Sequence, residues 1–339
     1  MKALVYQGPF HLEIEERKKP VPKPGEVLIE VKACGICGSD IHGYAGKTGR
    51  RTPPVIMGHE FSGILSGIGS EVQDLIKGQR VTVQPLLSCG ECADCRSGRR
   101  AQCAYKSCLG AMSRDGAMTE YLCVDQHHVR ILPEEVSFAQ AAVVEPLAVA
   151  YRAVNSQEVK GKTVFVAGVG TIGLLTVMML AARGARQIIV SDRSEYRLNL
   201  ASRLGAGMTL NAAHDDFSRQ IASLSEGKGI DLSFEAVGIG PTVSQALDCL
   251  KKGGHCVWIG NSAKMIELNM QQVVTRELSI SGTYGYSDDD FSQALTMISS
   301  GKIAASSIVD RQVSLEEAPA VFDSLARGAD QPVKCLIVF

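Results

Sequence analysis

The sequence predicts an α/β protein with a doubly wound parallel sheet and a second, mostly β domain. From about residue 140 onward, short apolar strands alternate with helical segments, which is typical of parallel strand–helix–strand units. Residues 1–130 instead hold short apolar runs separated by turns such as Lys23-Pro24-Gly25, which indicates an irregular β region. A length of 339 residues favours two domains.

The alternation after residue 140 predicts individual elements. We expect strands at 163–167, 187–191, 208–211, 231–235, 255–259 and 278–281. Helical segments are expected between most of these strands, for instance at 171–183, 195–204 and 241–250. The C-terminal part predicts two further helices and a final strand from Val333 to Phe339.

Composition excludes several classes of protein. The net charge is −1, with 35 basic and 36 acidic side chains, so no electrostatic footprint for nucleic acid or an anionic membrane is expected. No apolar run reaches the roughly 18 residues of a membrane span, and the N-terminus has no signal-peptide pattern, so we expect a cytoplasmic protein. In that compartment the clustered members of the eleven cysteines indicate metal binding rather than disulfides.

A glycine-rich loop follows the first predicted strand of the parallel sheet. The order of strand, Gly-x-Gly-x-x-Gly loop, helix and acidic residue is typical of dinucleotide binding, because the glycines admit the pyrophosphate and the helix N-terminus stabilises it. Asp192 follows 19 residues after the last glycine, where a carboxylate can hold the ribose. The predicted cofactor-binding residues are Gly168, Gly170, Thr171, Ile172, Gly173 and Asp192.

The acidic residue also bears on which cofactor binds. Asp192 should repel a 2′-phosphate, which favours NAD over NADP. Arg193 follows directly and could weaken that preference, and Arg197 could reach the ribose. The alternative for both arginines is a solvated start of a helix.

Four cysteines occupy one short polar segment. Cys89, Cys92, Cys95 and Cys103 have spacings that suit a tetrahedral Zn²⁺ with no open position, which predicts a structural zinc site. The ligand types also allow an iron–sulfur cluster. The alternative without a metal is four free or buried cysteines.

A second group of metal-binding residue types is spread along the chain. Cys37, His59, Glu60 and Glu145 together offer a thiolate, an imidazole and carboxylates, which suit a catalytic zinc with a vacant position. Three of these residues also have an ordinary explanation: Cys37 and His59 as core residues, and Glu145 as the cap of a helix.

These motifs occur in the order found in the zinc-containing medium-chain alcohol dehydrogenase family, which the chain resembles over essentially its whole length. The segment Gly58-His59-Glu60-x2-Gly63-x5-Gly69-x2-Val72 matches the zinc signature of that family. Glu145-Pro146-Leu147 makes the chain most similar to the sorbitol dehydrogenase-like polyol branch. The resemblance implies that Cys37, His59 and Glu60 ligate zinc and that Glu145 contacts the zinc-bound water or replaces a ligand.

The resemblance also implies an architecture. Residues 1–146 and 284–339 would form a discontinuous, GroES-like catalytic domain, and 147–283 the NAD-binding Rossmann domain. It implies two zinc ions per chain, NAD as cofactor and a homodimer or homotetramer. Lys334 is expected to approach the cofactor phosphates or to be solvated.

The reaction that the resemblance implies is hydride transfer from a secondary alcohol to nicotinamide, with Zn²⁺ as Lewis acid. The proton would leave through Ser39, the cofactor ribose and His42, because a hydroxyl both accepts and donates and imidazole titrates near neutral pH. A simple turn hydroxyl is the alternative for Ser39. Asp40 resembles the acid that orients a zinc-bound histidine, here His59.

The substrate class is less constrained. We expect a small polyol, sugar acid or sugar phosphate, and the segment Lys47-Thr48-Gly49-Arg50-Arg51 could bind an anionic group unless it is an ordinary exposed loop. Butanediol and threonine dehydrogenases of the same family are alternatives, although Glu145-Pro146 disfavours the threonine type. Two more distant alternatives are a zinc-ribbon module that binds nucleic acid and an inactive relative that only senses NAD.

Overall fold

The computed structural model describes residues 1–112, 114–214, 216–224 and 229–339. The chain folds into two compact units. Unit 1 comprises Met1–Glu145 and Ser287–Phe339, and unit 2 comprises Pro146–Tyr286. The sequence-based boundaries at 146 and 284 lie within three residues of these. None of the helices in the described ranges is both long and apolar enough to cross a bilayer.

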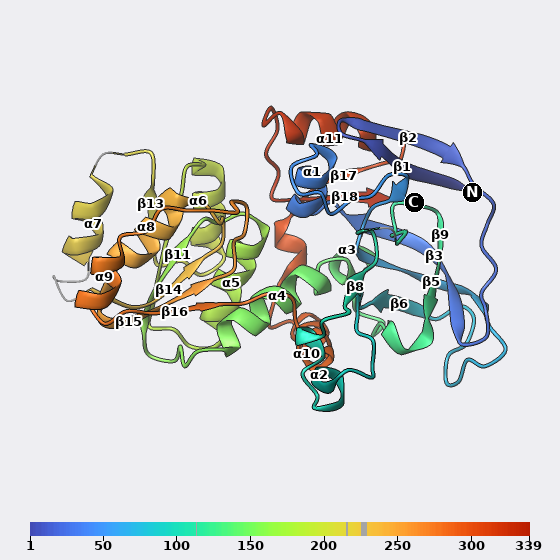
Figure 1. The fold of residues 1–339 in the computed structure, drawn as a ribbon, viewed down its shortest axis with the longest axis horizontal. Coiled ribbons are helices and arrows are strands. Elements are labelled where there is room, and N and C mark those ends of the chain that lie inside the picture. The colour runs from blue at the N-terminus through green and yellow to red at the C-terminus, as the bar shows by residue number, and fades with distance from the viewer. Residues whose placement is uncertain (113, 215, 225–228) are drawn as a thin grey trace. The chain divides into compact units, whose positions relative to one another are not determined.

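Unit 1 is built mainly of strands, as expected for the N-terminal region (Figure 1). Its strands are β1 (Lys2–Gly8), β2 (His11–Glu16), β3 (Glu26–Gly35), β4 (Val55–Ile56), β5 (Glu60–Ile68), β6 (Arg80–Val83), β7 (Leu86–Leu87), β8 (Ser107–Cys108), β9 (Tyr121–Asp125), β10 (Val129–Ile131), β17 (Val309–Val313) and β18 (Lys334–Val338). Its helices are α1 (Gly38–Tyr44), α2 (Ala93–Arg96), η1 (Arg100–Gln102), η2 (Gln126–His128), α3 (Phe138–Ala141), α10 (Asp288–Ser299), η3 (Ala305–Ile308) and α11 (Ala318–Ala326). The C-terminal prediction missed strand β17.

The main sheet of unit 1 joins segments that are distant in sequence. Its strand order is β10-β6-β5-β3-β18-β17, and β9 also pairs with β3. The last strand, β18, runs antiparallel to β3, with Leu336 opposite Gly35. The C-terminal segment therefore completes a sheet that the first third of the chain begins, and the core of unit 1 contains residues from both ends, such as Leu4 and Ile337.

Unit 2 contains a six-stranded parallel sheet with the order β13-β12-β11-β14-β15-β16. Its strands are β11 (Thr163–Ala167), β12 (Gln187–Asp192), β13 (Met208–Asn211), β14 (Ile230–Glu235), β15 (Leu250–Trp258) and β16 (Ser279–Gly282). Its helices are α5 (Thr171–Ala182), α6 (Glu195–Arg203), α7 (Phe217–Leu224), α8 (Gly240–Asp248) and α9 (Met270–Thr275), while α4 (Val144–Asn155) begins at the unit boundary. The six predicted strands and three predicted helices are confirmed, with ends shifted by at most five residues.

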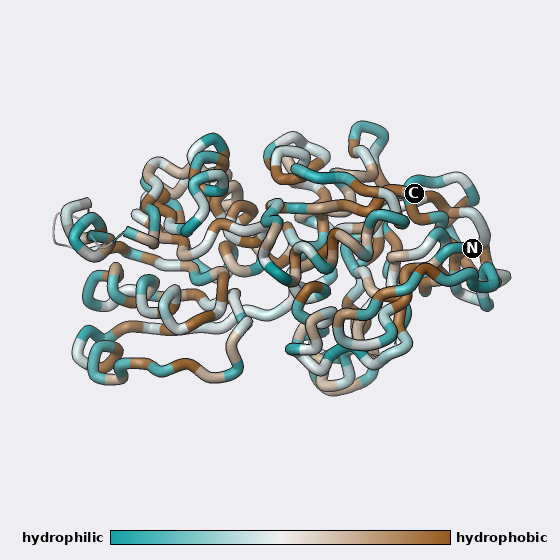
Figure 2. The backbone as a smooth tube through the Cα atoms, turned by 90° about the horizontal axis from the view of Figure 1, so that it is seen from above, coloured by the Kyte–Doolittle hydropathy of each residue, from teal (hydrophilic) through white to brown (hydrophobic). Residues whose placement is uncertain are grey.

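This strand order is that of the Rossmann fold, with its switch point between β11 and β14. All five residues of β11 are buried, which shows that both faces of the central strand are covered. Phe165 and Ala167 pack into the core that includes Val243 and Leu247 of α8. Figure 2 shows hydrophobic stretches of the tube interrupted by hydrophilic residues at many of its turns. The doubly wound sheet therefore places the loop after β11 where dinucleotides bind in such folds.

Candidate active site

The pairing of β3 with β5 brings the first metal-binding residue types together. Gly35, the last residue of β3, lies opposite Glu60, the first residue of β5. Cys37 follows two residues after β3, and His59 directly precedes β5. The register of one antiparallel pair therefore places a thiol, an imidazole and a carboxylate at the same edge.

Gly35 provides the space for this carboxylate. A Cβ atom on residue 35 would lie 2.2 Å from Glu60 Oε2, well inside van der Waals contact. A larger side chain here would have to displace the Glu60 carboxylate. Gly35 is part of the sequence pattern around Cys37, but only the pairing of β3 with β5 shows that it leaves space for the Glu60 carboxylate.

The ligand atoms of Cys37, His59 and Glu60 lie within 4.8 Å of one another. A thiolate, an imidazole and a carboxylate at this spacing fit Zn²⁺, and three protein ligands leave a fourth position for water or substrate. Cys37 is the N-cap of α1, where its Sγ accepts a hydrogen bond from the Ser39 N–H at 3.5 Å. The helix N-terminus thus fixes the thiol that would meet the metal.

Glu60 is held by a buried lysine. Lys334 Nζ lies 2.6 Å from Glu60 Oε2 and also donates to the Ile36 carbonyl at 3.2 Å, and both side chains are at most 2% exposed. Burial alone would lower the pKa of Lys334, but the charges of Glu60, Cys37 and Glu145 outweigh it and raise the pKa. Removing one partner of such a buried pair typically costs about 3–5 kcal/mol.

His59 faces the carboxylate of Asp40 in helix α1. His59 Nδ1 lies 3.6 Å from Asp40 Oδ1, a contact longer than a hydrogen bond. The same Oδ1 accepts a hydrogen bond of 2.7 Å from Arg51 Nη2, and Asp40 Oδ2 accepts one of 3.2 Å from the Cys37 N–H. Burial would lower the pKa of His59, but Asp40 and Cys37 outweigh it and raise the pKa well above its ordinary value.

The predicted proton-relay residues lie on the same short helix. Ser39 is exposed, and its Oγ accepts a hydrogen bond from Arg51 Nη2 at 3.3 Å. His42 is half-buried; this burial and the charge of Lys47 lower the pKa of His42. His42 therefore remains neutral, and able to accept a proton, at neutral pH.

Glu145 is half-buried in the first turn of α4. It is not among the three residues of the cluster, but its charge contributes to raising the pKa of Lys334 and of Cys108. Burial is the main reason that the pKa of Cys108 rises, to about 11. The structure thus gathers Glu60, rather than Glu145, with Cys37 and His59.

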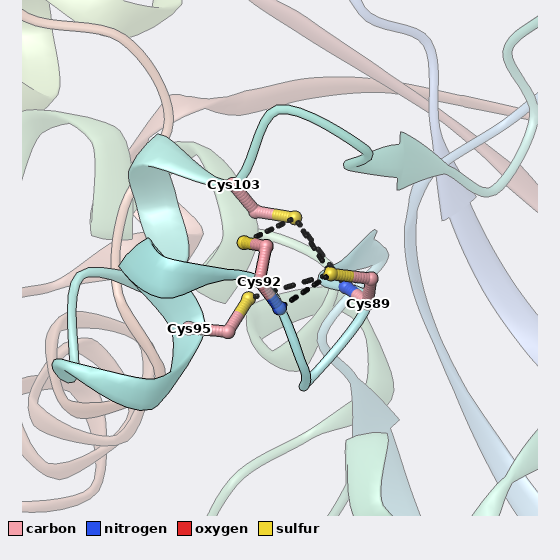
Figure 3. A group of neighbouring side chains, drawn as sticks. All are labelled: Cys89, Cys92, Cys95 and Cys103. Carbon is pink, nitrogen blue, oxygen red and sulfur yellow. Dashed lines mark hydrogen bonds between the residues drawn. The ribbon is translucent and has the colours of Figure 1, made fainter.

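The four cysteines of the second cluster converge on a common point (Figure 3). Their sulfur atoms are 3.5 Å apart for Cys89 and Cys103, 3.8 Å for Cys92 and Cys103, and 3.9 Å for Cys89 and Cys95. A tetrahedral Zn²⁺ with bonds of about 2.3 Å separates its sulfur ligands by about 3.8 Å, whereas a disulfide requires about 2.05 Å. The cluster therefore fits a four-thiolate metal site, and hydrogen bonds from the N–H groups of Glu91 and Cys92 lower the pKa of Cys89 to about 6.

In unit 2, the glycine loop has the geometry that the sequence predicted. Gly168 has a φ of +85°, and a Cβ on Gly173 would lie 1.9 Å from the Gly168 carbonyl oxygen, so helix α5 can approach the strand only with glycine there. Gly170 is the N-cap of α5, which begins with Thr171 and Ile172. The first helical N–H groups are thus directed towards the loop.

Asp192 and Arg197 both lie beside this loop. Asp192 Oδ2 accepts a hydrogen bond from the Val169 N–H at 2.9 Å, and its Oδ1 accepts one from the Ser194 N–H at the same distance. A Cβ on Gly170 would lie 3.8 Å from Arg197 Nη1, whereas Arg193 is exposed. Asp192 and Arg197 are therefore brought to the loop that would hold a dinucleotide.

Two family models match most of the chain. The alcohol dehydrogenase GroES-like domain matches residues 23–134, and the zinc-binding dehydrogenase model matches residues 171–300. A sorbitol dehydrogenase of Bacillus subtilis (strain 168) is 32% identical, over 100% of this chain and 96% of its own length. The chain belongs to the zinc-containing medium-chain alcohol dehydrogenase family.

Solved structures agree with this assignment. Galactitol-1-phosphate dehydrogenase of Escherichia coli has a TM-score of 0.93 and 29% identity, with 100% of both chains covered. A structure from Sinorhizobium meliloti 1021, described as a zinc-binding dehydrogenase bound to NADP, has a TM-score of 0.92 and 33% identity, covering 100% of this chain and 99% of that one. The dehydrogenase is a zinc polyol dehydrogenase of the sorbitol dehydrogenase-like branch that uses a nicotinamide cofactor. This assignment favours the enzyme over the zinc-ribbon and NAD-sensing alternatives.

Two expectations about basic residues of the dehydrogenase are wrong. Lys334 is not a solvated lysine, because its side chain is buried and paired with Glu60. Arg51 cannot form part of an exposed anion-binding loop, because it is 8% exposed and bound to Asp40, whereas Lys47 and Arg50 are exposed. The position of Lys334 in an otherwise apolar final strand was a signal that this lysine is buried and paired. The sequence contained no comparable signal for the pairing of Arg51 with Asp40.

Proposed function

We propose that the dehydrogenase oxidises a secondary alcohol of a polyol, sugar acid or sugar phosphate with NAD, at a zinc ion held by Cys37, His59 and Glu60. The observation that supports this most directly is the gathering of a thiol, an imidazole and a carboxylate within 4.8 Å, from segments that are distant in sequence. Unit 1 is then the catalytic zinc domain, and unit 2 is the NAD-binding domain. When bound, Zn²⁺ would polarise the substrate hydroxyl as a Lewis acid.

Other residues of the chain hold the zinc ligands in place and transfer the proton of the substrate alcohol. The Asp40 carboxylate faces the His59 imidazole without a full hydrogen bond, and Lys334 holds one oxygen of Glu60. Ser39 accepts the alcohol proton and passes it to His42, which is neutral at physiological pH because its pKa is lowered. Glu145 assists from the start of α4 as the partner of a water molecule or as an alternative ligand.

We assign a second, structural zinc to Cys89, Cys92, Cys95 and Cys103. Four thiolates complete a tetrahedral coordination shell, so no position remains for a substrate. The sulfur separations of 3.5–3.9 Å support this assignment over free thiols.

The cofactor preference follows from the side chains beside the glycine loop. Asp192 would hold the ribose hydroxyls of NAD and repel the 2′-phosphate of NADP. Arg197, beside Gly170, supplies a nearby positive charge, so we propose a preference for NAD rather than absolute exclusion of NADP. Asp192→Ala should lower kcat/KM with NAD about 10-fold to 100-fold. The ratio of kcat/KM with NAD to kcat/KM with NADP should therefore become smaller. An unchanged ratio would contradict the role of Asp192.

The substrate class follows partly from two exposed cations. Lys47 and Arg50 are exposed on the loop after α1, and we propose that their charges attract a carboxylate or phosphate of the substrate. Lys47→Ala with Arg50→Ala should therefore raise KM for a hexonate or sugar phosphate several-fold more than KM for a neutral polyol. Equal changes would indicate a neutral polyol as the substrate.

We also propose a cytoplasmic homodimer or homotetramer. In unit 2, β16 is an edge strand, and Met265, Met270 and Val274 nearby are 65–87% exposed. Exposed apolar residues beside an edge strand suit association of subunits. Light scattering after gel filtration gives the subunit number, and a monomer would contradict the proposal.

The proposed reaction is tested by NADH formation with a panel of polyols, hexonates, sugar phosphates, 2,3-butanediol and threonine. Metal content should be measured on the same sample, and we expect about two zinc ions per chain. Oxidation of a polyol or sugar derivative is the expected result. A clear preference for butanediol or threonine would assign the chain to those alternatives instead.

A further inference from the structure

A buried arginine lies beside the proposed catalytic zinc site and has no part in the reaction described above. The side chain of Arg51 is 4% exposed and that of Asp40 is not exposed at all. The absence of a side chain at Gly43 of helix α1 leaves space for Arg51, because a Cβ on Gly43 would lie 2.7 Å from Arg51 Cγ. A charged group is thus packed across the helix that carries Ser39, Asp40 and His42.

Arg51 and His59 share a single oxygen atom of Asp40. Arg51 Nη2 lies 2.7 Å from Asp40 Oδ1, whereas His59 Nδ1 lies 3.6 Å from the same atom. His59 Nδ1 is buried and has no hydrogen-bond partner among the residues that the structure describes. Asp40 Oδ1 thus lies within hydrogen-bonding distance of Arg51 but not of His59.

This competition has a chemical consequence for the metal. A carboxylate that accepts a hydrogen bond from a ligating histidine makes the imidazole more basic and holds the metal more tightly. Because Asp40 Oδ1 bonds to Arg51 and stays 3.6 Å from His59 Nδ1, the imidazole would donate less charge to the metal. The positive charge of Arg51 also opposes the nearby cation directly. Both effects leave the metal more weakly held and more strongly Lewis-acidic.

The same nitrogen of Arg51 also contacts the proposed proton relay. Arg51 Nη2 donates to Ser39 Oγ at 3.3 Å. A guanidinium has no acceptor, so the Ser39 hydroxyl proton must point to another group, and the Ser39 oxygen is held in one position. One guanidinium nitrogen therefore contacts both the carboxylate beside His59 and the hydroxyl that accepts the substrate's proton.

We propose that Arg51 is a positioning residue that keeps Asp40 from binding His59 fully and fixes Ser39, so that the catalytic zinc is held less tightly but is more reactive. This inference rests on the proposed zinc site. It predicts an unusual result: removing Arg51 should strengthen zinc retention while it slows the reaction.

The test is the rate at which the holoenzyme releases zinc to a chromogenic chelator without substrate. The kinetic phase of zinc release that is absent from the Cys37→Ala variant identifies the catalytic zinc. In Arg51→Met, this phase should be about 10-fold slower, because Asp40 turns to His59. kcat should fall about 10-fold, while KM for the alcohol should change less than about 2-fold. Arg51→Lys, which retains a cation, should restore the release rate to within about 3-fold of the wild-type value.

Two further variants keep the test decisive. Arg51→Gln removes the positive charge that opposes the zinc, so it should also slow release, but less than Arg51→Met because its amide can still hydrogen-bond to Asp40; it serves as the test if Arg51→Met does not fold. Arg80→Met is the matched control, because Arg80 donates to the carbonyls of Glu134 and Val136 in the same unit. It should lower thermal stability without changing zinc release.

Unchanged or faster release in a folded Arg51→Met or Arg51→Gln variant would overturn the proposal, because a merely structural arginine would loosen the site when removed. The outcome is independent of the substrate. If the wild-type enzyme oxidised nothing in the panel, the proposed reaction would fail, but the comparison of zinc release would still decide the role of Arg51.

Discussion

The two metal-binding clusters of unit 1 are assembled in opposite ways. The four cysteines lie between Cys89 and Cys103, on a loop, a single-turn helix and the segment after it. The other cluster takes Cys37 from the turn between β3 and α1, and His59 and Glu60 from the point where β5 begins. The supporting Lys334 comes from the last strand. Local spacing suffices for the closed site to which we assign a structural zinc, whereas the open site that we propose to be catalytic depends on strand pairing in the sheet.

The surroundings of the two clusters also differ. Two buried ion pairs, Arg51 with Asp40 and Lys334 with Glu60, support the Cys37 cluster. The ion pairs at the cysteine lobe, Arg99 with Asp94 and Arg100 with Asp288, are largely exposed and contribute little. A site that must leave one metal position vacant is thus fixed by the residues behind its ligands, while a filled four-sulfur site is fixed by the ligands themselves.

The largest expected effect separates the clusters by function. Cys37→Ala should lower kcat/KM at least about 10³-fold and remove one of two zinc ions, because a reactive-site ligand is lost. Its melting temperature should stay within a few degrees of the wild-type value, since β3 and α1 keep their packing. Activity and metal content on one sample check this, and retained activity without that zinc would refute the catalytic assignment.

The converse variant should affect stability first. Cys92→Ala should also remove one zinc ion but destabilise unit 1 by about 4 kcal/mol or more, because the loop loses the metal that orders it. Calorimetry should show a drop on the order of 10 °C. An unchanged melting temperature with full loss of activity would reverse the roles of the clusters.

The proton relay should contribute less than the metal. His42→Gln should lower kcat for alcohol oxidation about 10²-fold at neutral pH. In the wild-type enzyme His42 must be neutral to accept a proton, and its pKa is lowered, so activity should fall only when the pH drops below its ordinary pKa of about 6.5. This acid limb of the pH profile should disappear in the variant; an identical profile would exclude His42 from the relay.

The smallest effect concerns the space behind Glu60. Gly35→Ala should weaken catalytic zinc binding about 10-fold, because the new Cβ would lie 2.2 Å from Glu60 Oε2 and displace the carboxylate. Gly38→Ala is the matched control, since a Cβ there meets no atom within 4 Å among the described residues. Equal zinc affinity for both variants would show that Glu60 does not need its observed position.

Sequence pattern alone determined the elements whose signals are local. The strands and helices around the glycine loop and the convergence of the four cysteines depend on neighbouring residues, so periodicity and spacing predicted them. Asp192 was placed for the same reason, since it ends the strand after the loop helix.

Tertiary structure decided how the open site is completed. Lys334 and Arg51 looked like surface cations because their partners, Glu60 and Asp40, are brought to them by β-sheet pairing and by a loop that folds across α1. A charge can be buried only where an opposite charge meets it, and such a meeting over long sequence separation is not encoded in any local pattern. For that reason the sequence determined which residues can bind metal, and the fold determined which charges hold them.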